Sequence, residues 1–173
     1  MKCRKIYTGH TDSVNKVNFQ PFTNYFASCS SDKSISIWDM RGGLPVQTFY
    51  GHLNSINDVV FNVRGDMLYS CDGDGIVKVW DVRKIQEMYK FILKRNTFTA
   101  FPGVSANCIE VDKSCSIAYV GHDNGQLVTI NLNKNVVAEK KKAHEGSING
   151  IGINLQNTNV FTVGSDGYLN VWN

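Results

Sequence analysis

Short runs of alternating apolar and polar residues, separated by turn-forming residues, extend along most of the chain. The clearest run spans residues 51–81, with apolar side chains at Ile56, Val59 and Phe61 and an Asp-Gly-Asp-Gly turn at 72–75. Alternation with a period of two is typical of half-buried β-strands, and Asp and Gly are typical of tight turns. The pattern therefore predicts an all-β protein built from short antiparallel strands.

The landmarks of this run recur at a fixed spacing. Trp38 and Trp80 are 42 residues apart, Trp80 and Ile130 are 50 apart, and Ile130 and Trp172 are again 42 apart. Self-similarity at such a period indicates a repeat architecture, in which each unit buries its apolar face against the next. We therefore divide a single domain, residues 1–173, into repeats at approximately 1–40, 41–82, 83–132 and 133–173.

Each repeat is expected to contribute four strands. The first strand carries apolar residues that face the neighbouring repeat, namely Val14, Val17 and Phe19, then Ile56, Val59 and Phe61, then Ile109 and Val111, then Ile148, Ile151 and Ile153. In the first repeat the second and third strands are expected at 25–28 and 35–38. Outer strands are expected at 46–50, 88–92 and 136–139, and a long loop at 93–103.

The dipeptides Gly-His and Trp-Asp bracket the first two repeats, as Gly9-His10 with Trp38-Asp39 and as Gly51-His52 with Trp80-Asp81. With these motifs the chain resembles the WD40-repeat family over essentially its full length. The resemblance implies a β-propeller with one blade per repeat. Four such blades do not normally close on themselves, so we expect a partial propeller, or half of an eight-bladed ring closed by dimerisation.

In the WD40 family a His, a Ser or Thr, an Asp and a Trp form a hydrogen-bonded network inside each blade. Register assigns this structural network to His10, Ser28, Asp32 and Trp38, to His52, Ser70, Asp74 and Trp80, and to His144, Thr162, Asp166 and Trp172. The third repeat has Pro102, Val120, Asn124 and Ile130 instead, so the network is expected to be absent there. Register also places Gly121-His122 in the turn before Asn124 rather than at the start of a repeat.

Ser, His and Asp within one repeat also resemble a hydrolase triad. An active site needs one exposed nucleophile beside a base and an oxyanion site. Here the same residues recur with a Trp at the repeat period, and the chain has no Gly-x-Ser-x-Gly elbow. We therefore expect a structural network and no catalytic residue, no enzyme activity, and no cofactor.

Two groups of residues are candidates for partner binding. Phe98 and Phe101 lie on the long loop, where aromatic side chains suggest an anchor, although they would equally serve to cover the third repeat. Lys140, Lys141 and Lys142 form a basic run. Such a run is either a solvated edge that discourages strand pairing or a contact for phosphate or a tubulin tail.

The amino-acid composition favours an ordered globular protein. Hydrophobic residues make up 42% and charged residues 19%, as in an ordered globular protein, and a net charge of +3 gives no support for a nucleic-acid or membrane partner. No apolar run approaches the ~20 residues that span a bilayer. The five cysteines form no Cys-x-x-Cys pair, so we expect reduced thiols in a cytosolic compartment and no metal site.

The ends of the repeat pattern are unpaired. Each repeat starts with the outer strand of the preceding blade, so residues 3–8 are expected to form an outer strand without a blade of their own, while the last blade, ending at Trp172-Asn173, lacks its outer strand. Unpaired strands and exposed apolar faces need partners. Either further blades precede Met1, or two copies associate.

The second repeat carries a more specific resemblance. Residues 55–61, Arg64-Gly65, Ser70-Cys71-Asp72 and Trp80-Asp81 look like the C-terminal WD repeats of the sperm-associated antigen 16 type. That resemblance implies a structural protein of the ciliary or flagellar central apparatus, located in the cytoplasmic axoneme and bound to central-pair microtubule-associated proteins. A general adaptor in a cytosolic or nuclear complex, such as a ubiquitin-ligase substrate receptor, is the alternative.

Overall fold

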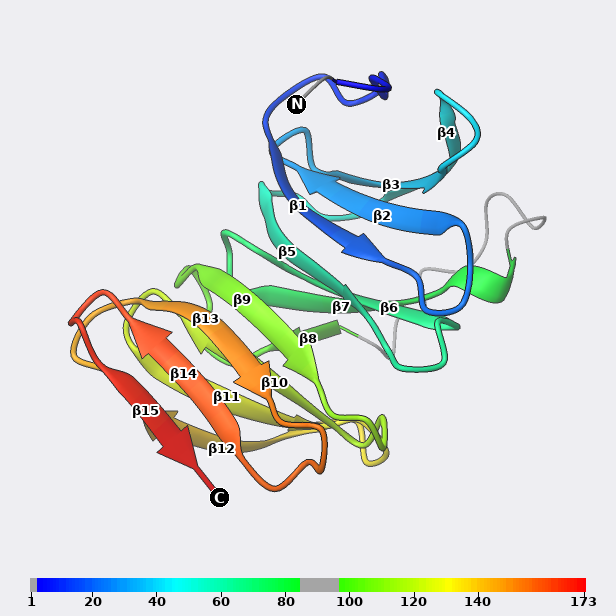
Figure 1. Ribbon diagram of the computed structural model, residues 1–173. Helices are drawn as coiled ribbons and strands as arrows, with labels where there is room; N and C mark the ends of the chain where they lie inside the picture. Colours follow the sequence, from blue (N-terminus) through cyan, green and yellow to red (C-terminus); the bar gives the residue numbers. More distant parts are fainter. Residues whose placement is uncertain (1–2, 85–96) are drawn as a thin grey trace.

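The computed structural model describes residues 3–84 and 97–173 as four antiparallel sheets (Figure 1). Sheet by sheet, the strands are β1 (Val14–Phe19), β2 (Tyr25–Ser30), β3 (Ser34–Asp39) and β4 (Pro45–Tyr50); β5 (Ile56–Phe61), β6 (Met67–Asp72), β7 (Ile76–Asp81) and β8 (Thr97–Thr99); β9 (Ala106–Val111), β10 (Ile117–His122), β11 (Gln126–Asn131) and β12 (Val136–Lys142); and β13 (Ile148–Ile153), β14 (Val160–Gly164) and β15 (Leu169–Trp172). One 3-10 turn, η1 (Val82–Lys84), follows β7. The predicted all-β architecture of four propeller blades is confirmed.

The first strands of the blades, β1, β5, β9 and β13, lie side by side, each in contact with the next (Figure 1). Consecutive strands within a blade pair in sequence order, so the loop that enters each first strand and the turn between the second and third strands share one face of the molecule. We call this face the loop face. The loop between the first and second strands of each blade lies on the opposite face.

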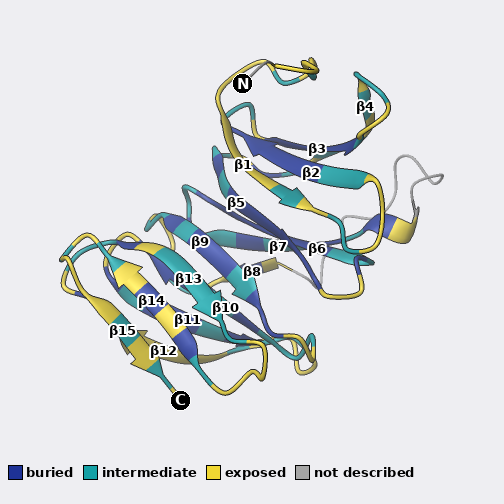
Figure 2. Ribbon diagram, in the orientation of Figure 1, coloured by how far each residue is buried: buried dark blue, intermediate teal, exposed yellow. Residues whose placement is uncertain are grey.

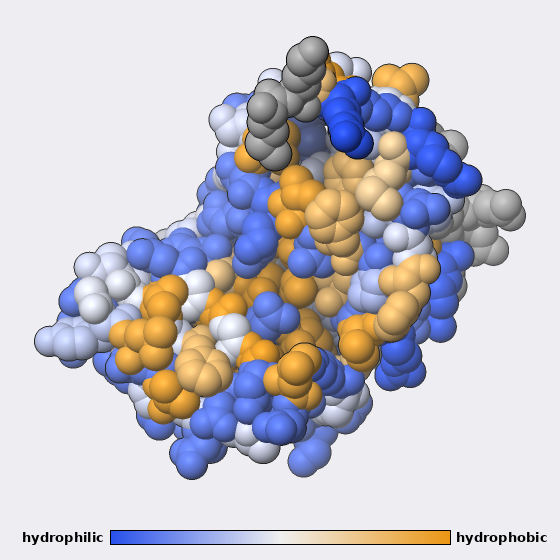
Figure 3. All heavy atoms as spheres, in the orientation of Figure 1, coloured by the Kyte–Doolittle hydropathy of each residue, from blue (hydrophilic) through white to orange (hydrophobic). Residues whose placement is uncertain are grey.

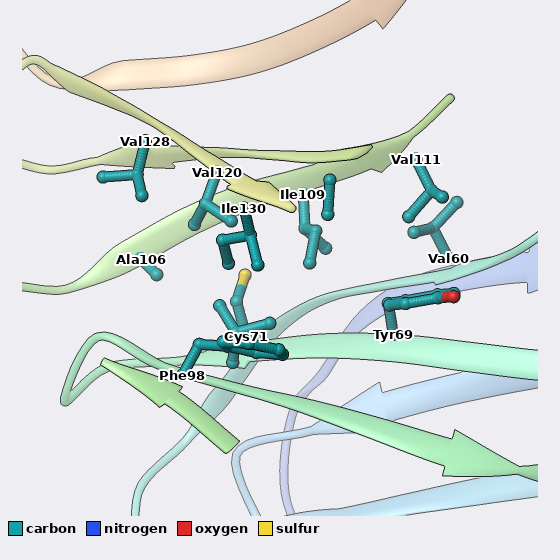
Figure 4. Close-up of a cluster of buried hydrophobic side chains, with 12 residues drawn as sticks. Val60, Tyr69, Cys71, Phe98, Ala106, Ile109, Val111, Val120, Val128 and Ile130 are labelled. Carbon is teal, nitrogen blue, oxygen red and sulfur yellow. The ribbon is translucent and has the colours of Figure 1, made fainter. Parts of the chain in front are cut away.

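Apolar side chains seal the blades against one another. Between the first and second blades, Ile35, Ile56, Val59 and Leu68 have no exposed surface. Figure 4 shows the corresponding cluster between the second and third blades, where Cys71 and Phe98 meet side chains from β9, β10 and β11. Burying each large aliphatic side chain contributes about 1.5 to 3 kcal/mol. Buried residues are most frequent in the two middle blades, which have a neighbour on each side, whereas the first strand, β1, and the last strand, β15, are more exposed (Figure 2).

The outer strand of the second blade lies later in the chain than predicted. It is β8, which pairs with β7 through Val77 and Phe98, whereas the predicted range 88–92 lies outside the described residues. Alternation explains the position, because in Thr97-Phe98-Thr99 only Phe98 is buried. The additional residues of the third repeat therefore precede this outer strand rather than follow it. In the described part of the expected loop at 93–103, residues 97–99 form a strand and residues 100–103 form a loop.

Residues 3–8 form no strand, contrary to expectation. The ring of Tyr7 packs edge-on against Phe26 and Trp38 of the first blade, with centroid distances of 5.1 and 5.7 Å. Its hydroxyl donates to the carbonyl of Met40 at 2.8 Å. Aromatic packing on the first blade thus holds a segment that has no neighbouring strand to pair with. The fourth blade has three strands, and β15 forms its edge.

Candidate functional site: polar networks, loop face and central cavity

In the first blade the structure brings the four expected residues together. His10 lies between the second strand and the loop, with Nδ1 at 2.8 Å from Asp32 Oδ2 and Nε2 at 2.7 Å from Ser28 Oγ. Trp38 Nε1 donates to the same Ser28 oxygen at 2.7 Å. The network therefore joins the loop that precedes β1 to β2, to the following turn and to β3.

The fourth blade repeats this geometry with a threonine. His144 Nδ1 lies 3.0 Å from Asp166 Oδ1, and its Nε2 lies 2.8 Å from Thr162 Oγ1. Trp172 Nε1 donates to Thr162 Oγ1 at 3.0 Å. Either serine or threonine can therefore occupy this position of the network, because both supply the hydroxyl group that binds the histidine and the tryptophan.

The second blade corrects the sequence assignment. His52 Nδ1 bonds to Asp72 Oδ2 at 2.6 Å, not to Asp74, and both Asp72 and His52 side chains are fully buried. Asp74 instead accepts a hydrogen bond from Asn54 Nδ2 at 2.8 Å. The reason is strand direction: Asp72 is the last residue of β6 and points inward, while Asp74 lies in the exposed part of the turn. Ser70 and Trp80 occupy their expected places, with Trp80 Nε1 at 2.9 Å from Ser70 Oγ.

The third blade replaces the polar network with apolar packing. Val120 and Ile130 are buried where the other blades have a hydroxyl and a Trp, and both join the cluster shared with the second blade. Asn124 accepts a turn hydrogen bond from the Gln126 backbone, and Pro102 has no imidazole to offer. A blade without the network is therefore held by burial of apolar surface, which often replaces a buried polar network at no cost in stability.

His122 lies in a strand, not in the turn where register placed it. It ends β10, is 1% exposed, and meets the Phe101 ring edge-on at a centroid distance of 5.3 Å. Burial lowers the pKa of His122, so the ring is held neutral against its apolar neighbours. This histidine takes the position of Asp72 in the second blade.

The hydroxyl groups of the networks are not nucleophiles. Ser70 and Thr162 have no exposed surface and Ser28 is 3% exposed. Each hydroxyl also accepts a hydrogen bond from an indole N–H, as described above for all three. A catalytic serine must be open to substrate, with an oxyanion site beside it. The arrangement instead fastens strands within each blade.

The carboxylate of Asp32 is stabilised in its charged form. Although burial acts to raise its pKa, hydrogen bonds from Ser34, the Thr11 backbone and His10 outweigh burial and hold the pKa of Asp32 below its ordinary value of 3.8. A carboxyl group whose pKa is lower in the folded chain than in the unfolded chain stabilises the fold. This stabilisation is complete at pH values above the pKa of the unfolded chain, and it is lost as the pH falls through the pKa of the folded chain.

We therefore predict that Asp32→Asn makes stability less sensitive to acid. The free energy of unfolding of the native chain should fall more steeply below a pH of about 4 than that of the variant, because only the native chain must protonate this carboxylate. Urea unfolding at a series of pH values measures the two slopes. Asp12→Asn, in the exposed loop that precedes β1, is the control and should keep the native slope, because the Asp12 carboxylate accepts only the N–H of the adjacent Ser13. Parallel slopes for the native chain and Asp32→Asn would contradict the assignment.

The predicted partner-binding residues serve internal contacts. Phe98 is 6% exposed and belongs to the core between the second and third blades, so it cannot anchor a partner. Phe101 is only partly exposed. Lys140 covers its ring, with Nζ at 4.5 Å from the centroid, and donates to the Ala100 carbonyl at 2.7 Å. Of the two alternatives for these aromatic residues, covering the third blade is the one that the packing favours.

The other two lysines are also engaged. Lys141 Nζ lies 4.4 Å from the centre of the Trp172 ring, and Lys142 Nζ donates to the Asn124 carbonyl at 3.1 Å. All three lysines belong to the exposed outer strand β12. Their ammonium groups link that edge to neighbouring segments, and a partner contact by the basic run stays a prediction.

A polar cavity of roughly 250 Å³ lies where the first strands converge. Its wall includes Asp58, whose Oδ1 lies 3.3 Å from Lys16 Nζ in the first blade and whose Oδ2 accepts from the Ile109 backbone N–H in the third at 3.1 Å. Burial raises the pKa of Asp58, and the Lys16 ammonium partly opposes this. One side chain of the second blade thus ties together both neighbouring blades.

The cysteines are free thiols, in agreement with their spacing. Cys29, Cys71 and Cys108 are buried, and burial raises the pKa of Cys29 and of Cys108 to about 12. Such thiols stay protonated and unreactive. Within the described residues no three His, Cys, Asp or Glu side chains gather in a way that could hold a metal ion, and no helix there is long and apolar enough to cross a membrane.

Comparison with known proteins agrees with this geometry. The family described as WD domain, G-beta repeat matches residues 1–39, 43–81 and 136–173. The chain belongs to the WD40-repeat family. The matched segments contain the three polar networks, and the unmatched residues 82–135 contain β9 to β11 of the third blade, where the network is replaced. WD40 propellers generally act as non-catalytic scaffolds for protein interaction, and no catalytic family is indicated.

Individual relatives match over a single repeat length. The WD repeat-containing protein 89 homolog of Dictyostelium discoideum is 44% identical over 43 residues, which are 25% of this chain and 12% of that protein. The ribosome biogenesis protein BOP1 homologs of Drosophila virilis and Drosophila melanogaster are 42% and 40% identical over 43 residues, 6% of each protein. The chain matches only these small shares of its relatives' lengths, so the similarity identifies the repeat and not a partner.

Proposed function

We propose that this WD40 protein is a non-catalytic scaffold that binds other proteins through its loop face. The observation that carries this proposal is the use of the polar networks, whose hydroxyl, imidazole and carboxylate groups are consumed by one another inside the blades. They make the blades rigid and leave the connecting loops as the variable surface. The side chains that those loops expose would then determine which proteins the scaffold binds.

We assign the proposed binding surface within the loop face to three large exposed side chains. Tyr50 ends β4 and is 71% exposed, Leu53 follows it in the loop to β5 and is 77% exposed, and Tyr168 lies in the turn between β14 and β15 and is 68% exposed. Aromatic and aliphatic residues of this kind are the usual anchors of protein interfaces. Unlike Phe98, which is buried in the core, all three side chains are open to a partner.

We further propose that the scaffold belongs to the central apparatus of motile cilia or flagella. The support is the resemblance of the second repeat, including Ser55–Phe61 and Ser70-Cys71-Asp72, to the C-terminal repeats of the sperm-associated antigen 16 type. Its partners would then be central-pair microtubule-associated proteins, and its place the axoneme. An adaptor in a cytosolic or nuclear complex is the second candidate, favoured by the single-repeat similarity to proteins named for ribosome biogenesis.

Localisation in a ciliated cell separates the two proposals. A tagged full chain should remain on detergent-extracted axonemes, and Leu53→Glu with Tyr168→Glu should release it by placing charge in the interface. Leu155→Glu is the matched control, because Leu155 is 84% exposed in the turn between β13 and β14 on the opposite face. Nuclear or diffuse signal would overturn the axonemal role, and release by Leu155→Glu alone would overturn the assignment of the loop face.

A further inference from the structure

One backbone hydrogen bond joins the loop that enters each first strand to the following turn in every blade. The side chains that accompany this bond differ between blades. In the first, second and fourth blades a loop histidine is bonded to a carboxylate, whereas the buried histidine of the third blade is His122, on the strand itself. The turn N–H groups of Ser31, Gly73, Asp123 and Ser165 donate to the carbonyls of Ser13, Ser55, Ser105 and Ser147, at 2.8 to 3.0 Å.

His122 is closed in by the entry loop of the third blade, residues 100–105. The ring is 1% exposed, meets Phe101 edge-on at 5.3 Å, and has Nδ1 at 3.4 Å from the Val104 carbonyl oxygen. Exposed apolar atoms gather over β1 and over β14 and β15 (Figure 3), whereas this ring lies in the third blade, which packs against a blade on each side. Segments that the structure describes therefore produce its burial.

Within the described chain no carboxylate is paired with this ring. The entry loop has no titratable side chain, and β12 supplies Lys140, whose positive charge disfavours a second one on the ring. A proton on His122 would therefore be a buried charge without a partner, which is costly. The other titratable side chains of the flanking segments are engaged or neutral: Asp123 with Asn107, Asp74 with Asn54, His144 with Asp166, Glu145 with Lys142, and Cys108 as a protonated thiol.

The second blade responds differently to acid. A proton on His52 would face the Asp72 carboxylate, whose Oδ2 lies 2.6 Å from Nδ1, and would be paired at once. The equivalent contact of the third blade has an aromatic ring and a carbonyl group in place of the carboxylate. Acidification therefore leaves an unpaired charge in the third blade and none in the second.

We propose that the entry loop of the third blade opens when His122 takes up a proton. Opening lets the charged ring reach water, while the closed loop holds the ring neutral. The loop belongs to the loop face, so its opening would change the surface assigned to partner binding, a consequence that rests on the proposed function. The opening itself does not depend on a partner.

The direction of the pH dependence follows from burial. The pKa of His122 is held below its ordinary value of 6.5 in the closed state, chiefly by burial. The closed state is therefore fully stable above that pH and loses stability as the pH falls below it, because only the open state binds the proton there. The ratio of open to closed loop should rise by up to about tenfold per pH unit, since opening takes up one proton.

Hydrogen exchange of the native chain tests this at equivalent amides of two blades. The Asp123 N–H, which is bonded to Ser105, should lose up to about tenfold in protection per pH unit below 6.5, after correction for intrinsic exchange. The Gly73 N–H, which is bonded to Ser55, should keep its protection. Because no partner protein is present, this result is separate from whether the loop face binds one. Unchanged protection at Asp123, or equal losses at both amides, would overturn the proposal.

His122→Gln removes the titrating group. Protection of the Asp123 amide should then be independent of pH between about 5 and 7.5, the range in which only histidine side chains ordinarily titrate. Asp123→Asn is the matched control, because it changes the exposed neighbouring residue and should keep the native pH dependence at the amide of residue 123. A His122→Gln variant with the native pH dependence would show that another group opens the loop.

Titration of the four histidine rings of the native chain by NMR needs no substitution. The His122 ring should titrate with a midpoint below 6.5, because the closed loop opposes its protonation. This measurement decides the matter even if His122→Gln fails to fold. A midpoint at or above 6.5 would mean that the closed loop accepts the charge, and the proposal would be wrong.

Discussion

Replacing Asp72 by Ala should lower the free energy of unfolding by about 3 to 5 kcal/mol, the range measured when one partner of a buried ion-paired network is removed. The loss is large because Asp72 accepts from three groups. Its Oδ2 lies 2.6 Å from His52 Nδ1, and its Oδ1 accepts the backbone N–H groups of Asp74 and Ile76 at 3.0 and 2.9 Å. Each would be left without a partner in a site closed to water.

Asp74→Ala is the matched control, two residues away in the same turn. Asp74 accepts one side-chain hydrogen bond from Asn54 in a partly exposed position, so its removal should cost only about 1 kcal/mol. Urea unfolding of both variants, at a pH where carboxylates are ionised, measures the difference directly. If Asp74→Ala were the more damaging change, the sequence register would be right and the assigned pairing of His52 wrong.

This contrast shows where sequence reasoning reaches its limit. The repeat period places two carboxylates within reach of His52, because residues 72–75 alternate Asp and Gly. Alignment with Asp32 selects Asp74, yet inward direction and burial select Asp72. The repeat period and the composition identify the turn. Which of the two carboxylates points inward depends on the residue at which the strand ends, and the sequence pattern predicts that residue only to within one or two positions.

The sequence predicts that the third blade lacks the network, but it predicts neither the packing role of His122 nor the contacts of the asparagines between blades. Register places His122 in a turn, whereas in the structure it is buried at the end of β10 and packs against Phe101, a contact that the sequence pattern does not indicate. Three asparagines at the repeat spacing, Asn15, Asn57 and Asn107, each donate from Nδ2 to a backbone carbonyl at the start of the first strand of the next blade. The spacing of these asparagines can be seen in the sequence. Their role cannot be predicted from it, because an asparagine side chain can donate to many acceptors and the acceptor here lies in the next blade.

The second large effect is expected at a glycine. Gly125→Ala should destabilise the chain by about 3 to 5 kcal/mol, the range of exceptional single substitutions with a steric cause. Gly125 has φ +75°, and a Cβ there would collide with the carbonyl oxygen of His144 and lie 2.6 Å from that of Gly146. Its own carbonyl accepts the backbone N–H groups of Ala143 and His144, so the loop cannot move aside without losing hydrogen bonds.

Gly167→Ala is the control that measures the cost of the left-handed backbone conformation without the steric collision. Gly167 occupies the corresponding turn of the fourth blade with φ +84°, and a Cβ there meets nothing within 4 Å. Its substitution should cost only the left-handed conformation, about 1 to 2 kcal/mol. Thermal and urea unfolding of the pair measure the excess for Gly125, which we attribute to the loop entering β13. Because that loop covers the Gly125 turn while Gly167 faces open space, equal losses would mean that the third and fourth blades are not packed together in solution.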